Sequence, residues 1–137
     1  ALPEVAPMQL AAARIFVSHL EEARDFYRDK LGLDLEFESS SDGFCKFRSG
    51  GVQILLETVA PEAPPEDQAL VGRFLGLSFA VEDIRIRYDH LQAMGVAFVG
   101  PPELQPWGGM LATLADPSGN TLQIVQYPAP SSSSASR

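Results

Sequence analysis

The chain has 137 residues, 45% of them hydrophobic, so it is long enough to bury one sizeable core within a single domain. A formal net charge of −8, from 18 acidic and 10 basic residues, disfavours nucleic acid as a partner because phosphate backbones would be repelled. A single cysteine excludes an internal disulfide framework. Neither a membrane-spanning apolar run nor a secretory leader is evident, so we expect a cytoplasmic protein without a membrane partner.

The first half of the chain predicts a strand, a helix and three further strands. The helix is expected to begin at Ser18, since Glu21 completes a capping-box pattern, and to end at Gly32. Apolar runs separated by turn signals predict the strands, over residues 10–17, 34–39, 43–48 and 52–58. We therefore expect a βαβββ module over residues 10–59, preceded by a flexible N-terminus over residues 1–9.

The second half of the chain repeats this order. A proline-rich segment over residues 60–73 predicts a surface linker without regular structure, and a strand over residues 74–81 then precedes a helix that Asp83 can cap. Three strands follow, over residues 96–99, 110–115 and 121–126. These elements form a second βαβββ module over residues 74–127, before a Ser-rich tail over residues 128–137 that we expect to be disordered.

The last two strands are joined by the turn Asp116-Pro117-Ser118-Gly119-Asn120, whose residue types favour a tight reversal. These two strands are therefore expected to be antiparallel neighbours. A single βαβββ unit covers its own sheet poorly, so two copies are expected to share one core. The sequence thus predicts an α+β fold in which curved mixed sheets form an incomplete barrel.

Four stretches of the sequence carry a family resemblance, namely EEARDFYRDKLGLDL, LSFAVEDI, MGVAF and QPWGGMLATLADPSGNTLQIVQ. Over residues 10–127 the chain resembles the glyoxalase, bleomycin-resistance and extradiol-dioxygenase superfamily, also called the vicinal-oxygen-chelate fold. The resemblance implies that each module curls into an incomplete barrel whose concave face holds a ligand. It also implies, for metal-dependent members, a His, Gln or Glu on the first and last strand of each module.

The positions that the resemblance assigns to metal ligands fall on Ala12, Leu55, Gly76 and Gln123. Of these, only Gln123 has a donor side chain, and one amide cannot hold a metal alone. We therefore expect no metal, no other cofactor and no catalytic residue. The histidines, His19 at the start of the first helix and His90 inside the second, are expected to lie away from the concave face.

Strand alternation places apolar and polar side chains together on the concave face, as is usual for a small-molecule pocket. The candidate ligand-binding residues are Arg14, Phe16, Gln53, Leu55, Glu57, Ser78, Trp107 and Gln123. Trp107, the only tryptophan, lies in a Pro-Trp-Gly-Gly loop and can either stack on an aromatic or cationic ligand or plug the end of the barrel. Cys45, between Phe44 and Phe47, is expected to be a buried hydrophobe and not a nucleophile.

Three functions stay open at the level of the sequence. The first is a metal-free, non-catalytic homodimer that binds a small cationic or aromatic molecule, such as an antibiotic or a metabolite. The second is a lyase, isomerase or dioxygenase of the same superfamily, using unexpected metal ligands or an acid/base such as Glu57. The third is a structural or regulatory module without a ligand. The sequence does not decide whether the cavity is completed within one chain or across a dimer.

Overall fold

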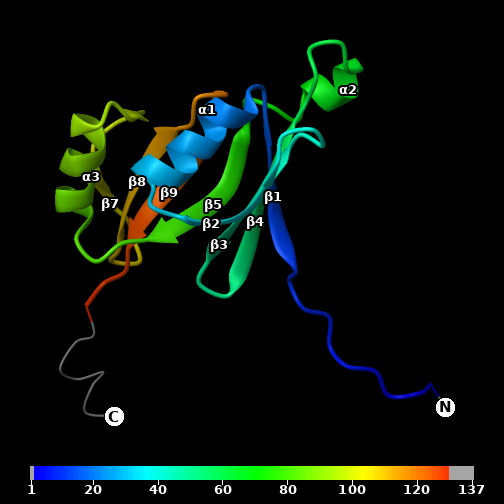
Figure 1. Cartoon of the computed structure of the whole chain (residues 1–137). Coiled ribbons are helices and arrows are strands. Elements are labelled where there is room, and N and C mark those ends of the chain that lie inside the picture. The colour runs from blue at the N-terminus through cyan, green and yellow to red at the C-terminus, as the bar shows by residue number, and fades with distance from the viewer. Residues whose placement is uncertain (1, 130–137) are drawn as a thin grey trace.

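The computed structural model describes residues 2–129, and most of the predicted Ser-rich tail, residues 130–137, lies outside them. Two modules with the same order of elements are joined by a short helical segment (Figure 1). The first module contains β1 (Ala12–Val17), α1 (Leu20–Asp25), the π-helix η1 (Phe26–Lys30), β2 (Asp34–Ser39), β3 (Phe44–Ser49) and β4 (Val52–Thr58). After α2 (Pro65–Gln68), the second contains β5 (Phe74–Ala80), α3 (Ile84–Ala93), β6 (Ala97–Phe98), β7 (Glu103–Leu104), β8 (Met110–Ala115) and β9 (Thr121–Gln126).

Both sheets have the same strand order. In the first sheet β1 lies at one edge and pairs in parallel with β4, which pairs antiparallel with β3, and β3 with β2. In the second sheet β5 pairs in parallel with β9, followed by β8 and β6, and β7 also pairs with β8. This common order confirms the predicted α+β fold and its internal repeat. The two sheets stay open and do not close into a barrel.

Three local features differ from the sequence-based expectation. Ser18 does not cap α1, because the helix begins one residue later, with His19 at the N-cap, and the Ser18 amide donates instead to Ser118 Oγ at 3.0 Å. The proline-rich linker contains α2, since Pro64 and Pro65 stand at a helix start, where a missing N–H costs little. The short strand β7 was not predicted, because two residues carry no readable alternation.

The N-terminal segment, residues 2–11, has no regular structure and runs away from the body of the molecule (Figure 1). Its larger apolar side chains, Leu2, Val5 and Met8, are exposed. Among residues 2–129, no helix has the length and apolar character needed to cross a bilayer.

The core lies where the helices cover the sheets. In the first module α1 packs on β3 and β4, and in the second α3 packs on β8 and β9. Ile15, Phe47 and Leu56 from the first sheet and Leu114 and Leu122 from the second have no exposed surface, and they belong to one continuous cluster. Because strand side chains alternate, the other row of each sheet is left to point away from the helices.

The turn between β8 and β9 does more than reverse the chain. Asp116 is 5% exposed, and its carboxyl oxygens accept hydrogen bonds from Tyr27 Oη at 2.7 Å, from the backbone amides of Ser118 and Asn120 at 2.9 and 3.0 Å, and from Asn120 Nδ2 at 3.0 Å. Burial, together with the adjacent Asp116 carboxyl group, raises the pKa of Tyr27, so its hydroxyl keeps the proton that it donates. The hairpin of the second module is therefore fixed to η1 of the first.

Asn120 makes a second connection between the modules. It is fully buried, and its Nδ2 donates to the carbonyl of Phe16 on β1 at 2.8 Å. Its Oδ1 accepts from the amides of Gly72 and Arg73, at 2.8 and 3.2 Å, at the entrance to β5. One side chain thus holds the end of β1, the end of the linker and the turn itself in fixed positions.

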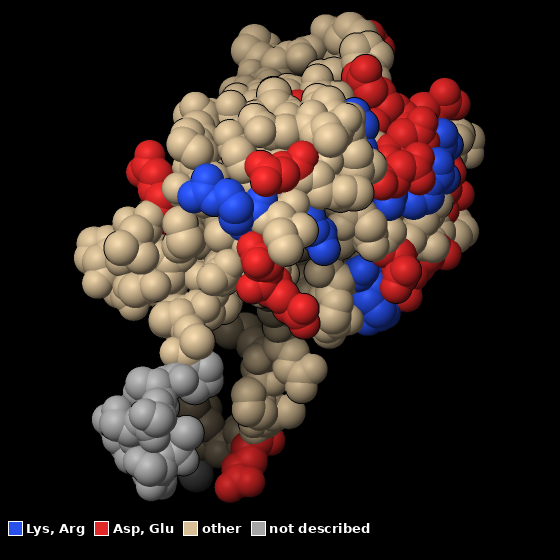
Figure 2. Space-filling model, turned by 90° about the vertical axis from the view of Figure 1, so that its left-hand side faces the viewer, with Lys and Arg blue, Asp and Glu red and all other residues tan. Residues whose placement is uncertain are grey.

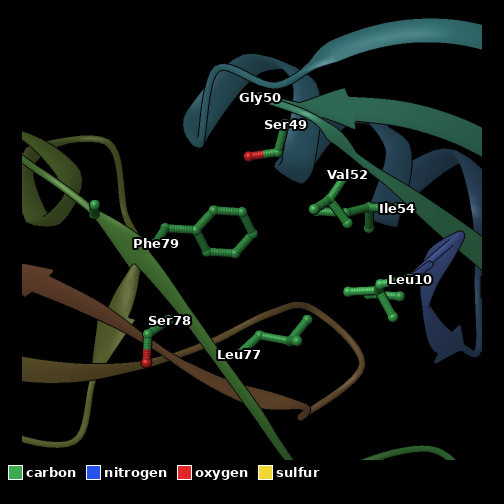
Figure 3. A pocket seen from close by; sticks show the side chains of 10 residues that line it. Leu10, Ser49, Gly50, Val52, Ile54, Leu77, Ser78 and Phe79 are labelled. Atoms are coloured by element: carbon green, nitrogen blue, oxygen red, sulfur yellow. The ribbon is translucent and has the colours of Figure 1, made fainter. Parts of the chain in front are cut away.

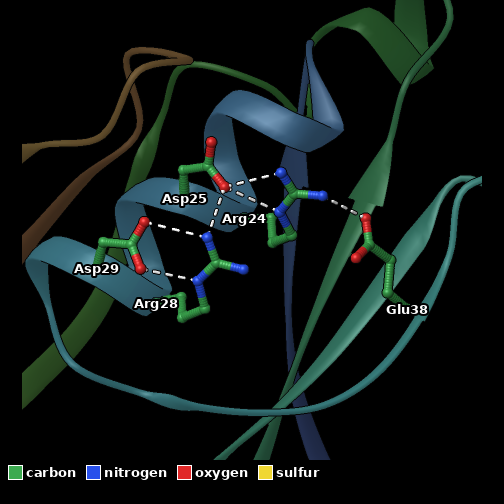
Figure 4. A network of polar contacts seen from close by, with 5 residues as sticks. All are labelled: Arg24, Asp25, Arg28, Asp29 and Glu38. Atoms are coloured by element: carbon green, nitrogen blue, oxygen red, sulfur yellow. Dashed lines mark hydrogen bonds and ion pairs between the residues drawn. The ribbon is translucent and has the colours of Figure 1, made fainter.

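Ion pairs attach the first helical segment to the neighbouring sheet edge (Figure 4). Arg24 bridges Asp25 and Glu38 on β2, each at 2.8 Å, and Arg28 bridges Asp25 and Asp29 at 3.1 and 2.8 Å. On the side of the molecule seen in Figure 2, acidic and basic side chains likewise lie next to one another. The Arg28 pairs are exposed and each contribute little to stability, whereas the Arg24–Glu38 pair is part-buried.

Replacing Asp116 by alanine is expected to lower the free energy of unfolding by on the order of 3 kcal/mol or more, because several buried donors lose their acceptor. Tyr27→Phe removes only one of these donors and is expected to cost about 1 kcal/mol. Denaturant unfolding of both variants measures the effect. The matched control is Asp89→Ala on the exposed side of α3, expected to change stability by less than about 0.5 kcal/mol. Equal stability of the Asp116 and Asp89 variants would contradict the role given to the turn.

Candidate functional site

The outward side of the first sheet, which we call the N-terminal face, brings several predicted residues together. Register places Arg14 beside Leu55, and Leu55 beside Lys46, so the three side chains form one row across β1, β4 and β3. The adjacent row runs from Phe16 through Glu57 to Phe44. The N-terminal face consists of Ala12, Arg14, Phe16, Asp34, Phe37, Ser39, Phe44, Lys46, Arg48, Gln53, Leu55 and Glu57.

Arg14 and Glu57 form a two-point ion pair on this face. Arg14 Nε and Nη2 donate to the Glu57 carboxylate at 2.5 and 2.9 Å, and the guanidinium carbon lies 5.2 Å from the centre of the Phe16 ring. The hydrogen bond from Arg14 holds the pKa of Glu57 below its ordinary value, against the opposing effect of burial. Glu57 is therefore a neutralised carboxylate, and its charge gives little reason for the face to prefer a cation.

The outward side of the second sheet, the C-terminal face, carries one carboxylate among neutral side chains. Ser78 on β5 lies in register beside Gln123 on β9, and Gln123 Nε2 donates to Thr113 Oγ1 on β8 at 3.2 Å. The C-terminal face consists of Ser78, Ala80, Glu103, Leu111, Thr113, Gln123 and Val125. It offers hydroxyl and amide groups between small and aliphatic side chains, together with the Glu103 carboxylate on β7.

Trp107 lies at the rim of the C-terminal face. Its ring covers Gly109, where any side chain would collide with it, and it lies 6.0 Å from the ring of Tyr127. Gly109 and Tyr127 directly extend the outward rows of β8 and β9. Trp107 nevertheless stays 50% exposed, so it packs on the sheet and still presents ring surface to solvent.

The four positions that the resemblance assigned to metal ligands do not supply a donor set here. Ala12 and Leu55 have only aliphatic side chains on the N-terminal face. Gly76 sits at an irregularity of β5 with a φ of +70° and has no side chain to offer. Gln123 is the only donor of the four, and among residues 2–129 no three His, Cys, Asp or Glu side chains converge. These residues do not fit a divalent metal, which needs several converging N or O ligands.

Hollows lie on both faces. One of about 320 Å³ on the N-terminal face is lined by Arg14, Phe44, Leu55 and Glu57 together with Asp42, Gly43 and Thr58. A hollow of about 220 Å³ on the C-terminal face is lined by Glu103, Leu111, Ala112, Thr113 and Gln123 together with Val99, Gly100, Pro101 and Gln105. The two hollows share no residue, so within one chain the predicted binding residues form two separate half-sites.

A third hollow, an apolar crevice of about 410 Å³, lies between β4 and β5 (Figure 3). Leu77 and Phe79 point into it from one side and Val52 from the other, whereas the hydroxyl of Ser78 points away. Because Leu77 and Phe79 belong to the row that packs against the core, the crevice is a gap at the junction of the two sheets. It is distinct from the two faces on which the predicted residues lie.

Sequence reasoning missed the outward residues of the middle strands, since it considered only the first and last strand of each module and the Trp107 loop. On β3 the alternation of Phe44, Lys46 and Arg48 with buried Cys45 and Phe47 was a readable signal. Cys45 itself has no exposed surface, as expected, and burial raises the pKa of its thiol to about 11. His19 and His90 lie on neither face.

Comparison with known proteins gives consistent matches over nearly the whole described chain. The profile of the Glyoxalase/Bleomycin resistance protein/Dioxygenase superfamily matches residues 9–124. The uncharacterized protein YraH of Bacillus subtilis (strain 168) is 31% identical over 127 residues, which cover 87% of this chain and 98% of YraH.

Two solved structures resemble the chain in both sequence and shape. One is a member of the Glyoxalase/bleomycin resistance protein/dioxygenase superfamily from Sphaerobacter thermophilus DSM 20745, with a TM-score of 0.72, 31% identity and coverage of 88% of this chain and 98% of that one. The other is TnmS3, an antibiotic binding protein from Streptomyces sp. CB03234, with a TM-score of 0.68, 30% identity and coverage of 90% and 99%.

The Arg14–Glu57 pair predicts that the pKa of Glu57 lies below its ordinary value in the folded protein. Because the folded pKa of Glu57 is lower than its unfolded pKa, the pair stabilises the fold above the unfolded value, and this stabilisation is lost as the pH falls through the folded value. Carbon-detected NMR titration of the Glu57 carboxyl group measures the folded pKa. In an Arg14→Met variant it should move up toward the ordinary value of glutamate. An unchanged Glu57 pKa in that variant would show that the pair does not form in solution.

Proposed function

Since the chain belongs to the Glyoxalase/Bleomycin resistance protein/Dioxygenase superfamily, we propose that it is a metal-free binding protein for a small aromatic molecule, an antibiotic or a metabolite, held on its outward sheet faces. The observation that carries this proposal is the composition of the N-terminal face. Its rows alternate ring and aliphatic surface with hydrogen-bonding groups, which is the character of small-molecule sites. Phe37 is 51% exposed there, and its ring lies 5.6 Å from that of Phe44.

Exposed aromatic surface on both faces supports an aromatic ligand. Phe37 on one face and Trp107 on the other each leave about half of their surface open, at 51% and 50%. Aromatic rings stack on such surfaces with favourable energy beyond simple burial. TnmS3, the related antibiotic binding protein, further supports a binding role for a chain of this length and shape.

We further propose that two copies of the chain complete the site. A pocket that binds a small molecule usually buries most of the ligand's surface, and a second copy would close an open face over it. The hollows on the two faces share no residue, so the complementary wall must come from elsewhere. The C-terminal face of a second copy can supply this wall. A homodimer in the cytoplasm, as expected from the sequence, stays a prediction.

An enzyme of the same superfamily, whether a metal-dependent or acid/base lyase, isomerase or dioxygenase, has less support. General acids and bases work best when their pKa lies near the working pH. The hydrogen bond from Arg14 moves the pKa of Glu57 in the opposite direction, down from its ordinary value. The four positions considered for metal ligands also lack a donor set, as described above.

The binding proposal is tested with a neutral aromatic dye, N-phenyl-1-naphthylamine, titrated by fluorescence into protein dialysed against EDTA. Binding is expected to saturate, and Leu55→Arg is expected to weaken it by about tenfold or more, because the guanidinium fills the hollow of the N-terminal face. The matched control is Ile86→Arg, since Ile86 is 67% exposed on α3, away from both faces. Equal weakening by both variants, or no saturable binding by the wild type, would overturn the proposal.

The same proteins test the assembly. Sedimentation equilibrium should show a dimer for the wild type and for Ile86→Arg, and a shift toward monomer for Leu55→Arg, whose new charge would be buried between the copies. If the wild type is monomeric and still binds the dye saturably, the site is not completed by a second copy.

A further inference from the structure

The N-terminal face gathers three cationic side chains in a chain whose net charge is −8. Two of them are already neutralised, since Arg14 pairs with Glu57, and Arg48 Nε pairs with Glu36 at 2.8 Å. Lys46 shares a row with Arg14 and lies two residues from Arg48 on β3. It forms no ion pair within 4.0 Å with any residue of the described range 2–129. Lys46 is therefore the cation of this face that is free to meet a ligand.

The neighbouring carboxylate does not change this assignment. Lys46 is close enough to Glu36 to help lower its pKa, but the hydrogen bond from Arg48 is the largest cause of that shift. Arg48 thus binds the Glu36 carboxylate, and Arg14 binds the Glu57 carboxylate. An anion that reached Lys46 would not have to displace an existing partner of the lysine.

Ring and aliphatic surface flank Lys46 on both sides. In register, Lys46 lies beside Phe37 on β2 and beside Leu55 on β4. Phe37 is 51% exposed and packs at 5.6 Å against Phe44, whose ring also lines the shallow hollow next to Leu55. A flat ligand lying on these side chains would bring an acidic substituent next to the ammonium group, where a charge-assisted hydrogen bond can form.

We propose that the ligand is an aromatic molecule with an anionic substituent, a carboxylate, sulfonate or phosphate, and that Lys46 binds this substituent. The inference rests on the proposed function and names the ligand class for the same face. It differs from the cationic ligand considered from the sequence, since the Glu57 carboxylate on this face is already paired with Arg14. Lys46 supplies the unpaired positive charge of this face, while Phe37, Phe44 and Leu55 hold the ring.

The test compares two dyes with the same ring system, 1-anilinonaphthalene-8-sulfonate, which is anionic, and N-phenyl-1-naphthylamine, which is neutral. Lys46→Met is expected to weaken binding of the sulfonate dye by about tenfold, the usual worth of a hydrogen bond to a charged group. It should change binding of the neutral dye by less than about twofold, because the methionine keeps the apolar stem. Lys46→Arg should retain the preference for the anionic dye, and raising the salt concentration should reduce it.

Arg85→Met is the matched control, because Arg85 is exposed on α3 and its loss changes the net charge equally. If Lys46→Met and Arg85→Met weaken binding of the sulfonate dye to the same extent, the effect is long-range and the inference is wrong. The inference is also wrong if Lys46→Met weakens binding of both dyes equally. If the wild type binds neither dye, the proposed function fails, whereas binding of the neutral dye with no preference for the anionic one overturns only the role of Lys46.

Discussion

The Asp116 carboxyl group is the point on which the arrangement of the two modules depends. It accepts hydrogen bonds from the hydroxyl of Tyr27, from two backbone amides of its own turn and from the Asn120 side chain. Burying a carboxyl group without a cation is costly unless its oxygens are fully used, and here the protein supplies the donors. Asn120 extends the same network to the carbonyl of Phe16 on β1. The two sheets are therefore joined through polar contacts as well as through the shared hydrophobic core.

This connection leaves the outward sides of the sheets available for ligands. The side chains of the inward rows, such as Ile15 and Leu56, are buried in the core beneath the helices, whereas those of the outward rows are not part of that core. The same strand order thus produces two faces that carry different residues, and the second sheet has β7 as an additional strand. The first face carries charge and rings, and the second carries hydroxyl, amide and small side chains with the Glu103 carboxylate. The fold sets where a ligand can lie, and these residue choices set which ligand binds.

Much of the fold was predictable from the sequence. The βαβββ repeat followed from hydrophobic periodicity and turn residues, and several strands, among them β4, β8 and β9, have the bounds expected from the pattern. The helix start at Ser18 was mispredicted because a capping box is a local signal, and the Ser18 amide is used in a contact with Ser118, a hundred residues away. A local sequence pattern cannot show that a residue far away in the chain will bind the same backbone amide.

The candidate site was only partly predictable, for a related reason. Alternation correctly placed Arg14, Leu55 and Glu57 on one side of the sheet. It could not show that Arg14 and Glu57 pair, because that depends on the parallel register of two strands separated by more than thirty residues. It also left out Lys46 on the middle strand, since the family resemblance directed attention to first and last strands. Lys46 and the Arg14–Glu57 pair are the two features on which the proposal of an anionic substituent rests.

The most direct measurement is an isotope-filtered NOE experiment on the complex with N-phenyl-1-naphthylamine, recorded on a mixture of labelled and unlabelled protein. We predict NOEs from the dye to Phe37 and Leu55 in one copy and to Thr113 in the other. NOEs confined to Val52 and Phe79, in the crevice between β4 and β5, would contradict binding on the outward faces.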